Sequence, residues 1–112
     1  MPVNRNDLKF PYKFRNKELI PAIIWNAEKG PLSLFYMDEA AVKKSVETGY
    51  VWRYSREHQQ LMMKGATSGN RMKIIDITPD CDNDALSVEV QPEGPICHLG
   101  YDSCFYLRHQ TS

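Results

Sequence analysis

Residues 19–37 carry the clearest structural signal: they read LIPAIIWNA over residues 19–27, EKGP over residues 28–31 and LSLFYM over residues 32–37. The first and last parts are rich in β-branched, aliphatic and aromatic side chains, a composition that favours strands. Pro21 stands near the start of the first part, where a strand tolerates proline. The Gly-Pro pair between them is typical of a turn. We therefore predict a β-hairpin formed by residues 19–27 and 32–37.

A short helix is predicted directly after this hairpin. Asp38 suits the N-cap position, Glu39 follows in the first turn, and Gly49 provides the stop. The side chains expected to share one face of this helix are Ala41, Val42, Ser45 and Val46.

The rest of the chain alternates between strands and turns, which indicates an α+β pattern. Strands are expected over residues 50–55, 71–78 and 86–91, with turns at 67–70 and 92–95. Within residues 71–78, alternation separates two sets of side chains: Met72, Ile74 and Asp76 against Lys73, Ile75 and Ile77. Within residues 86–91, the side chains expected on the buried face are Leu86, Val88 and Val90.

The composition bounds the class of protein. A chain of 112 residues is expected to form a single domain over residues 1–112. Fourteen basic and fourteen acidic side chains cancel, so no overall field would attract nucleic acid or an anionic membrane. No apolar run approaches the ~20 residues of a membrane span, and residues 1–14 lack the apolar core of a signal peptide. Three cysteines without such a signal indicate reduced thiols and a cytoplasmic location.

Residue types that commonly bind metals are concentrated in the C-terminal third of the chain. Residues 80–84 read DCDND, and Cys97, His98 and Cys104 follow. Thiolates select zinc, whereas clustered carboxylates suit a hard ion such as Mg²⁺. Three thiolates leave one position open in a tetrahedral zinc shell, where a bound water can become a nucleophile. The pattern points to a metallohydrolase.

Each of these groups also has a simpler interpretation. Free cysteines are often small buried hydrophobic residues, and this spacing matches no common zinc finger. The acidic residues do not form a calcium loop, because Ala85 and Gln91 occupy its glycine and glutamate positions. They could form an acidic turn, or an extended segment that turns the three aspartates to one side and Cys81 to the other. We expect His98 to lie next to the metal ion without binding it, because the adjacent residues Cys97 and His98 would be strained if both bound one ion.

The loop at residues 64–70 reads KGATSGN and is a candidate phosphate site. Backbone N–H groups of such a loop, together with Lys64, can hold a phosphate. The loop does not have the order of a P-loop, and many hairpin turns have this composition. Residues 53–73 carry five basic side chains against one acid, Glu57, which favours an anion.

Two longer motifs resemble a known family. Residues 80–86, DCDNDAL, and residues 94–106, GPICHLGYDSCFY, are similar to the two signature motifs of the phosphoribosyl-AMP cyclohydrolases of histidine biosynthesis. The resemblance covers roughly residues 8–106. Shorter matches fall at residues 19–23, 36–37, 47–49, 55–56 and 64–69.

The resemblance implies a fold and an activity. The fold would be α+β, a small mixed β-sheet or pseudobarrel domain with one or two short helices, in an intertwined homodimer. The enzyme would use zinc and magnesium to hydrolyse the N1–C6 bond in the purine ring of phosphoribosyl-AMP.

The resemblance also implies roles for individual residues. The implied zinc ligands are Cys81, Cys97 and Cys104, one of which would reach across the dimer interface. The implied magnesium ligands are Asp80, Asp82 and Asp84, and His98 would be the acid/base residue. The expected contacts to the small-molecule nucleotide substrate are Arg56, Lys64, Thr67, Ser68 and Gly69.

The chain departs from the family pattern at several positions. Where the family has Ser-Arg-Ser-Arg, residues 55–58 read SREH, and Met62 replaces a tryptophan. Residues 25–26 read WN in place of Gln-Asp, and Asp102 stands where a basic residue is common. If these positions face substrate phosphate, the pocket is less positive than in the family.

Two alternative functions follow: a paralogue acting on a related purine-like ring, or a non-catalytic zinc- or nucleotide-binding dimer. His98 and the three aspartates favour an enzyme, because metal storage needs neither.

Overall fold

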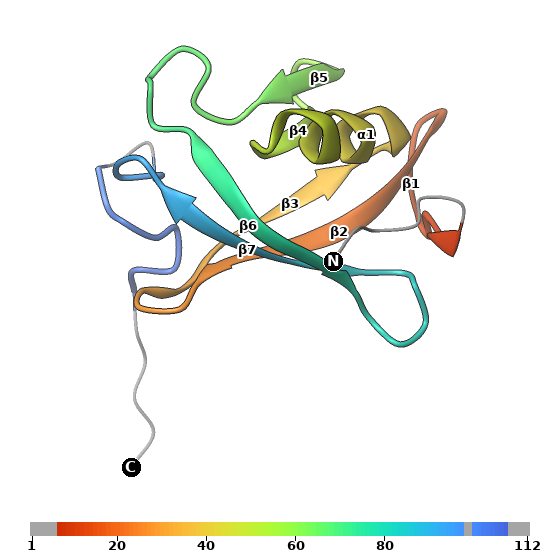
Figure 1. Ribbon diagram of the computed structural model, residues 1–112. Coiled ribbons are helices and arrows are strands. Elements are labelled where there is room, and N and C mark those ends of the chain that lie inside the picture. The colour runs from red at the N-terminus through yellow and green to blue at the C-terminus, as the bar shows by residue number, and fades with distance from the viewer. Residues whose placement is uncertain (1–6, 98–99, 108–112) are drawn as a thin grey trace.

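The computed structural model describes residues 7–97 and 100–107, which form a five-stranded mixed sheet, a two-stranded hairpin and one α-helix. The elements in chain order are β1 (Tyr12–Phe14), β2 (Lys17–Asn26), β3 (Gly30–Met37), α1 (Glu39–Thr48), β4 (Trp52–Ser55), β5 (Gln60–Met63), β6 (Met72–Pro79) and β7 (Leu86–Pro92). Helix α1 and the β4–β5 hairpin lie together over one side of the sheet (Figure 1). The α+β class is confirmed, with one α-helix among the described residues.

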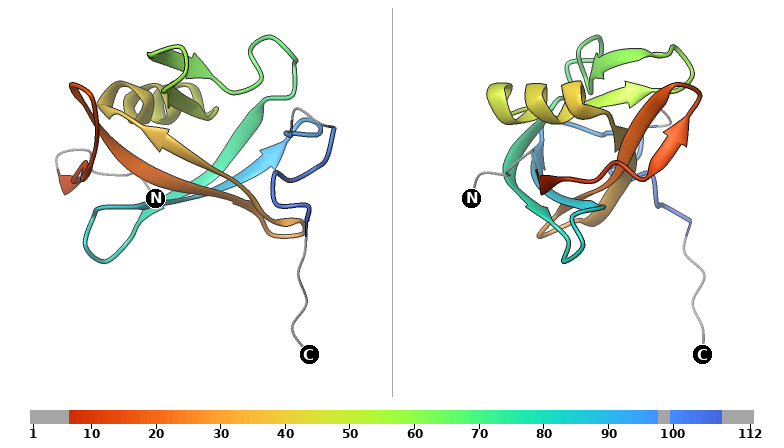
Figure 2. Two further views of the ribbon diagram at one scale, coloured as in Figure 1. Left: turned by 180° about the vertical axis from the view of Figure 1, so that it is seen from behind. Right: turned by 90° about the vertical axis from the view of Figure 1, so that its right-hand side faces the viewer.

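Strand β2 organises the sheet, because three strands pair with it. β3 and β1 are antiparallel to it, whereas β7 is parallel to it over residues 22–25. β6 then pairs antiparallel with β7. The sheet curls beneath α1 and the β4–β5 hairpin but stays open (Figure 2), so it is a mixed sheet and not a closed barrel. Because β2 and β7 are parallel, their C-terminal ends lie side by side, and the turns that follow them lie at the same end of the sheet.

The predicted hairpin is confirmed as β2 and β3. Ile20 pairs with Met37, Ile23 with Leu34, and Asn26 with Gly30. Asn26 is buried, and its side-chain amide donates to the Val90 carbonyl at 2.8 Å. The β2–β3 turn is therefore attached to strand β7.

The predicted helix boundaries are confirmed as well. The Asp38 carboxylate accepts a hydrogen bond from the Ala41 N–H at 2.8 Å, and Gly49 ends the helix with a φ of 76°. Ala41, Val42 and Ser45 are buried, but Val46 is 39% exposed. The prediction for Val46 is wrong because, at about 100° per residue, it lies beyond the edge of the stripe that the other residues form.

The predicted alternation of residues 71–78 fails at a β-bulge. The register with β7 shifts between Ile74 and Asp76, and an extra residue in a strand reverses the faces that follow it. Ile75 is consequently 56% exposed, whereas Ile77 is buried on the same side as Met72. The alternation of Leu86, Val88 and Val90 in β7 is confirmed, since all three are buried.

The core lies between the sheet and helix α1. It draws most of its side chains from strands β2 and β7 and from the helix. Its fully buried members include Ile20, Ala22, Ile24, Met37, Ala41, Val42, Val51, Met72, Leu86, Val88 and Val90. No helix within residues 7–97 and 100–107 is long and apolar enough to cross a membrane.

Candidate active site and metal ligands

A pocket of about 340 Å³ forms where the 64–70 loop meets the segment that follows β7. Its walls include Lys64, Ser68 and Asn70 from the loop. The facing wall consists of Pro95, Ile96, Cys97 and Gly100. One candidate zinc ligand and two of the candidate phosphate contacts therefore share a single pocket, although they lie far apart in the sequence.

The loop takes its shape from backbone bonds and one glycine. The Lys64 N–H donates to the Val51 carbonyl at 3.0 Å, and the Gly69 N–H donates to the Gly65 carbonyl at 2.8 Å. Gly65 has a φ of 84°, and a Cβ at this position would overlap the backbone carbonyl of Asn70. Residue 65 must therefore be glycine for two reasons, its conformation and the lack of space.

The loop is fastened to the segment that carries Cys97. The Asn70 side-chain amide donates to the Pro95 carbonyl at 2.9 Å, and a side chain at Gly94 would collide with Asn70. Next to it, Arg71 makes two bonds to the Glu93 carboxylate, at 2.8 and 3.3 Å. These contacts make Asn70 part of the site, although sequence analysis assigned it no role.

Cys97 and Cys104 both lie close enough to the Lys64 amine to affect its pKa. Burial is the main factor that lowers the Lys64 pKa, Arg53 adds to this effect, and both thiols act in the opposite direction. The Cys97 N–H donates to the Tyr101 carbonyl at 3.1 Å. The Cys104 N–H donates to the Leu32 carbonyl at 2.8 Å, which fixes this segment to β3.

Cys81 lies elsewhere, on the exposed turn between β6 and β7. In Figure 1 this turn and the segment with Cys104 lie at opposite ends of the sheet. Strand β7, from Leu86 to Pro92, separates them by roughly 20 Å at about 3.3 Å per residue. All three cysteines are free, but one chain does not bring them together. Among the described residues, no three metal-binding side chains lie close enough to hold an ion.

The three candidate magnesium ligands also lie on this turn. The Asp80 carboxylate accepts the Asp84 N–H at 3.0 Å, and the Asn83 N–H donates to the Asp80 carbonyl at 3.1 Å. The segment is therefore a turn, and the extended alternative considered for it is wrong. The Asp84 N–H lowers the pKa of Asp80, while the contact with the Asp80 carboxylate raises the pKa of Asp84. The carboxyl groups of Asp80 and Asp84 thus lie side by side in solvent, which agrees with the interpretation of this segment as an acidic turn.

The remaining candidate residues are divided. Thr67 and Gly69 lie on the exposed side of the loop. Arg56 is at the far end of the β4–β5 hairpin, in a different pocket from Lys64. His98 lies outside the described residues.

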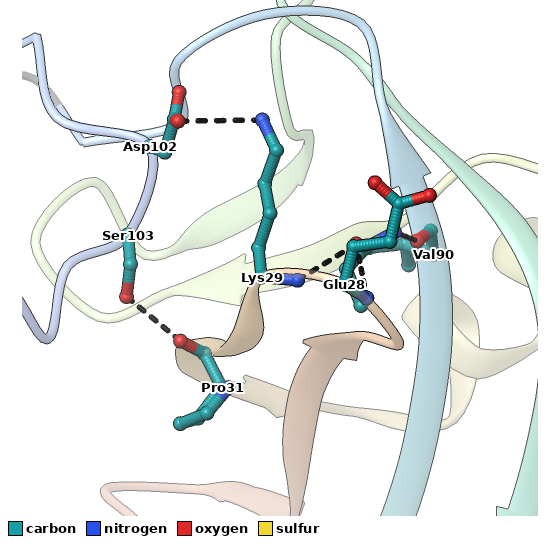
Figure 3. A network of polar contacts seen from close by, with 7 residues as sticks. Glu28, Lys29, Pro31, Val90, Asp102 and Ser103 are labelled. Carbon is teal, nitrogen blue, oxygen red and sulfur yellow. Dashed lines mark hydrogen bonds and ion pairs between the residues drawn. The ribbon is translucent and has the colours of Figure 1, made fainter.

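One departure from the family pattern, at position 102, takes part in an ion pair. Asp102 forms an ion pair with Lys29 at 3.4 Å, and the adjacent Ser103 hydroxyl donates to the Pro31 carbonyl at 2.8 Å (Figure 3). Both contacts dock the C-terminal segment on the β2–β3 turn. The negative charge at position 102 is therefore balanced by a lysine of the same chain.

Fold and site define a small α+β domain whose candidate metal ligands and phosphate contacts lie in loops at the two ends of a mixed sheet. The family model described as phosphoribosyl-AMP cyclohydrolase matches residues 33–106, and the chain belongs to this family.

Curated relatives agree with this assignment. The phosphoribosyl-AMP cyclohydrolase of Listeria monocytogenes is 47% identical over 92 residues, covering 81% of this chain and 88% of the relative. The histidine biosynthesis bifunctional protein HisIE of Halalkalibacterium halodurans is 47% identical over 105 residues, covering 93% of this chain. The HisIE protein of Shewanella oneidensis is 50% identical over 88 residues. The chain spans about half the length of the two bifunctional relatives, 48% and 42%.

Proposed function

We propose that this chain hydrolyses phosphoribosyl-AMP in histidine biosynthesis and opens the purine ring between N1 and C6. The Listeria monocytogenes relative bears the name of this activity, and the chain matches 88% of its length. The structural observation that carries the proposal is the shared pocket of Cys97, Lys64 and Ser68. A ligand for a soft metal and two groups suited to a phosphate line one cavity.

The donor set fits zinc. Cys97 and Cys104 are free thiols near the same lysine, and Cys81 is a third free thiol too distant to join them within one chain. We infer a homodimer in which Cys81 of one protomer completes the site formed by Cys97 and Cys104 of its partner. A zinc ion held there supplies the Lewis acidity that makes water a nucleophile at neutral pH.

The chain's own residues would bind the substrate and move protons. Hydrolysis joins the oxygen of water to C6 and breaks the bond from C6 to N1. His98, which follows the ligand Cys97, would take a proton from the water and return one to N1, a contribution worth ~10²–10⁴-fold. Lys64 and Ser68 would hold a substrate phosphate through a charge-assisted hydrogen bond and a hydroxyl group.

We also propose that Asp80, Asp82 and Asp84 bind Mg²⁺. Two of these carboxyl groups already lie together on the exposed turn, where the hydrogen bond with the Asp80 side chain is the main factor that raises the Asp84 pKa and repulsion between the two charges adds to it. A hard divalent cation with oxygen ligands would relieve that repulsion.

The ion pair of Asp102 with Lys29 bears on the choice of substrate. An unpaired carboxylate at position 102 would disfavour a phosphorylated ligand, but this one is balanced. The case for a paralogue with another substrate then depends on Glu57, His58 and Met62.

The free thiols also support a reducing, cytoplasmic location.

The test is to incubate the pure, zinc-loaded protein with phosphoribosyl-AMP, with and without Mg²⁺, and to follow the purine absorbance. We expect ring opening that needs zinc and is faster with Mg²⁺. The Listeria monocytogenes relative serves as the positive control. If this control is active and the zinc-loaded chain binds the nucleotide without turnover, the chain is a binding protein and the proposal is wrong.

A further inference from the structure

A second pocket, of about 470 Å³, lies between strand β3 and strand β4, and extends to the turn that follows β4. It has no residue in common with the pocket of Lys64 and Cys97. Its walls include Phe35, Tyr36, Arg53, Ser55, Arg56 and Glu57. Two guanidinium groups and several aromatic rings therefore line one cavity.

The two guanidinium groups rest on aromatic rings. The Arg53 Cζ atom is 5.6 Å from the centre of the Phe35 ring, and the Arg56 Cζ atom is 4.6 Å from the centre of the Tyr36 ring. Arg56 also donates to the Tyr12 hydroxyl at 3.4 Å. A guanidinium stacked on a ring keeps its N–H edge available for a planar or tetrahedral anion.

Among the described residues, neither arginine forms an ion pair with a carboxylate. Arg71 provides the contrast, because it also stacks on a tyrosine but is neutralised by two bonds to Glu93. Glu57 lines the same pocket as Arg53 and Arg56 and offsets part of their charge. The two arginines still leave the pocket with a net positive charge.

We propose that this Arg53–Arg56 pocket binds the phosphate monoester of a purine nucleotide. Guanidinium groups match the oxygens of a phosphate, and aromatic side chains provide surfaces on which a base can stack. Arg53 thereby becomes a binding residue, a role that no motif in the sequence indicated. The nucleotide is either the substrate, through one of its two phosphates, or a free nucleotide. The inference deepens the proposed function and rests on it only for the identity of the purine.

The test is calorimetric titration of the zinc-loaded full chain with AMP, which lacks the phosphoribosyl group on N1 and therefore measures binding without turnover. Arg53→Met should weaken AMP binding about tenfold to a hundredfold and leave adenosine binding nearly unchanged, because it removes a charge-assisted contact to phosphate. Glu57→Gln should strengthen AMP binding. The matched control is Lys44→Met: Lys44 also stacks on an aromatic ring, at 5.7 Å from Trp52, but lies on helix α1 outside the pocket.

Two further variants keep the test decisive. Arg53→Lys keeps the charge and loses the fork of N–H groups, so it should show a smaller loss and serves if Arg53→Met does not fold. Lys64→Met reports on the other pocket. If Lys64→Met weakens AMP binding and both Arg53 variants leave it unchanged, the inference is wrong. It is equally wrong if Arg53→Met changes the association of protomers but not AMP binding.

Turnover identifies the source of the phosphate. A higher KM for phosphoribosyl-AMP in Arg53→Met, with kcat unchanged, assigns the pocket to the substrate. An unchanged KM together with lost AMP binding assigns it to a free nucleotide. AMP binding that depends on Arg53 would support the inference even in a chain that hydrolyses nothing. If the enzyme is fully active and its AMP binding does not depend on Arg53, this inference is wrong and the proposed function stands.

Discussion

The side-chain amide of Asn70 donates a hydrogen bond to the carbonyl oxygen of Pro95 at 2.9 Å. This bond joins the loop of Lys64 and Ser68 to the segment of Cys97. It is possible because Gly65 and Gly94, on either side of Asn70, have no side chains. Together with the two bonds between Arg71 and Glu93, this contact sets the relative position of the proposed phosphate contacts and the proposed zinc ligand.

Replacing Asn70 should loosen this site. Asn70→Ala removes the bond to Pro95, which should cost about 0.5–1.5 kcal/mol of unfolding free energy and raise KM, because the loop and the Cys97 segment separate. Urea unfolding and steady-state kinetics measure the two effects. Gln60→Ala is the control, since Gln60 is an exposed residue of β5. An Asn70→Ala protein with the stability and KM of the parent would contradict the role of this contact.

Gly65→Ala should destabilise the protein more than Gly69→Ala does. The two glycines have similar φ angles, 84° and 80°, so both substitutions carry the cost of about 1 kcal/mol for a left-handed alanine. At Gly65 the added methyl group would also overlap the Asn70 carbonyl, whereas at Gly69 no atom lies within 4 Å. Urea midpoints give the difference directly. Equal losses would show that the loop can move away from Asn70.

These contacts also show why sequence analysis succeeded for some elements and failed for others. The β2–β3 hairpin and helix α1 depend on residues close in the chain, such as Asp38 and Gly49, and both were predicted correctly. The bulge near Ile75 depends on the register with β7, which local alternation does not reveal. The short strands β1 and β5 have three and four residues, too few to show a period.

The same distinction applies to the site. The motifs located the cysteines and the Lys64 loop, because residue type and spacing carry that chemistry. The strand predicted between Cys81 and Cys97 already separated these two residues, but the motifs could not show that Cys97 shares a pocket with Lys64, because tertiary packing brings these two segments together. Nor could they show that Asp102 pairs with Lys29, or that Arg53 joins Arg56, because these contacts depend on tertiary packing.

His98→Ala should leave zinc bound and lower turnover by about two or more orders of magnitude, since the role proposed for His98 is proton transfer. Metal analysis of the purified variant and steady-state kinetics measure the two quantities. If zinc is lost together with activity, His98 is a ligand and the assignment is wrong.

Asp82→Asn should reduce the response of the rate to Mg²⁺ and leave the zinc content nearly unchanged, because only the hard ion uses these carboxylates. The measurement is the rate as a function of Mg²⁺ concentration, with zinc determined on the same samples. A Mg²⁺ response equal to that of the parent would make residues 80–84 an acidic turn without a metal role.

Zinc content and dimerisation should be coupled, because Cys81 is too far from Cys97 and Cys104 to share an ion within one chain. A ligand set completed only in the dimer means that zinc binding favours association by mass action. Removing zinc with a chelator should therefore shift the chain towards monomer in sedimentation, and Cys81→Ser should do the same. A dimer dissociation constant that is identical with and without zinc would rule out the shared site.

Mixing variants tests which cysteine crosses the interface. Cys81→Ser and Cys97→Ser chains should each be inactive alone, but their mixed dimer has one site with Cys97 and Cys104 from the first chain and Cys81 from the second. Activity and zinc binding should therefore reappear when the two are unfolded together and refolded. A mixture of Cys97→Ser and Cys104→Ser is the matched control, because both changes damage the same half of the site and no mixed dimer contains an intact one. Recovery in the control mixture, or none in the first, would show that Cys81 is not the ligand that the partner supplies.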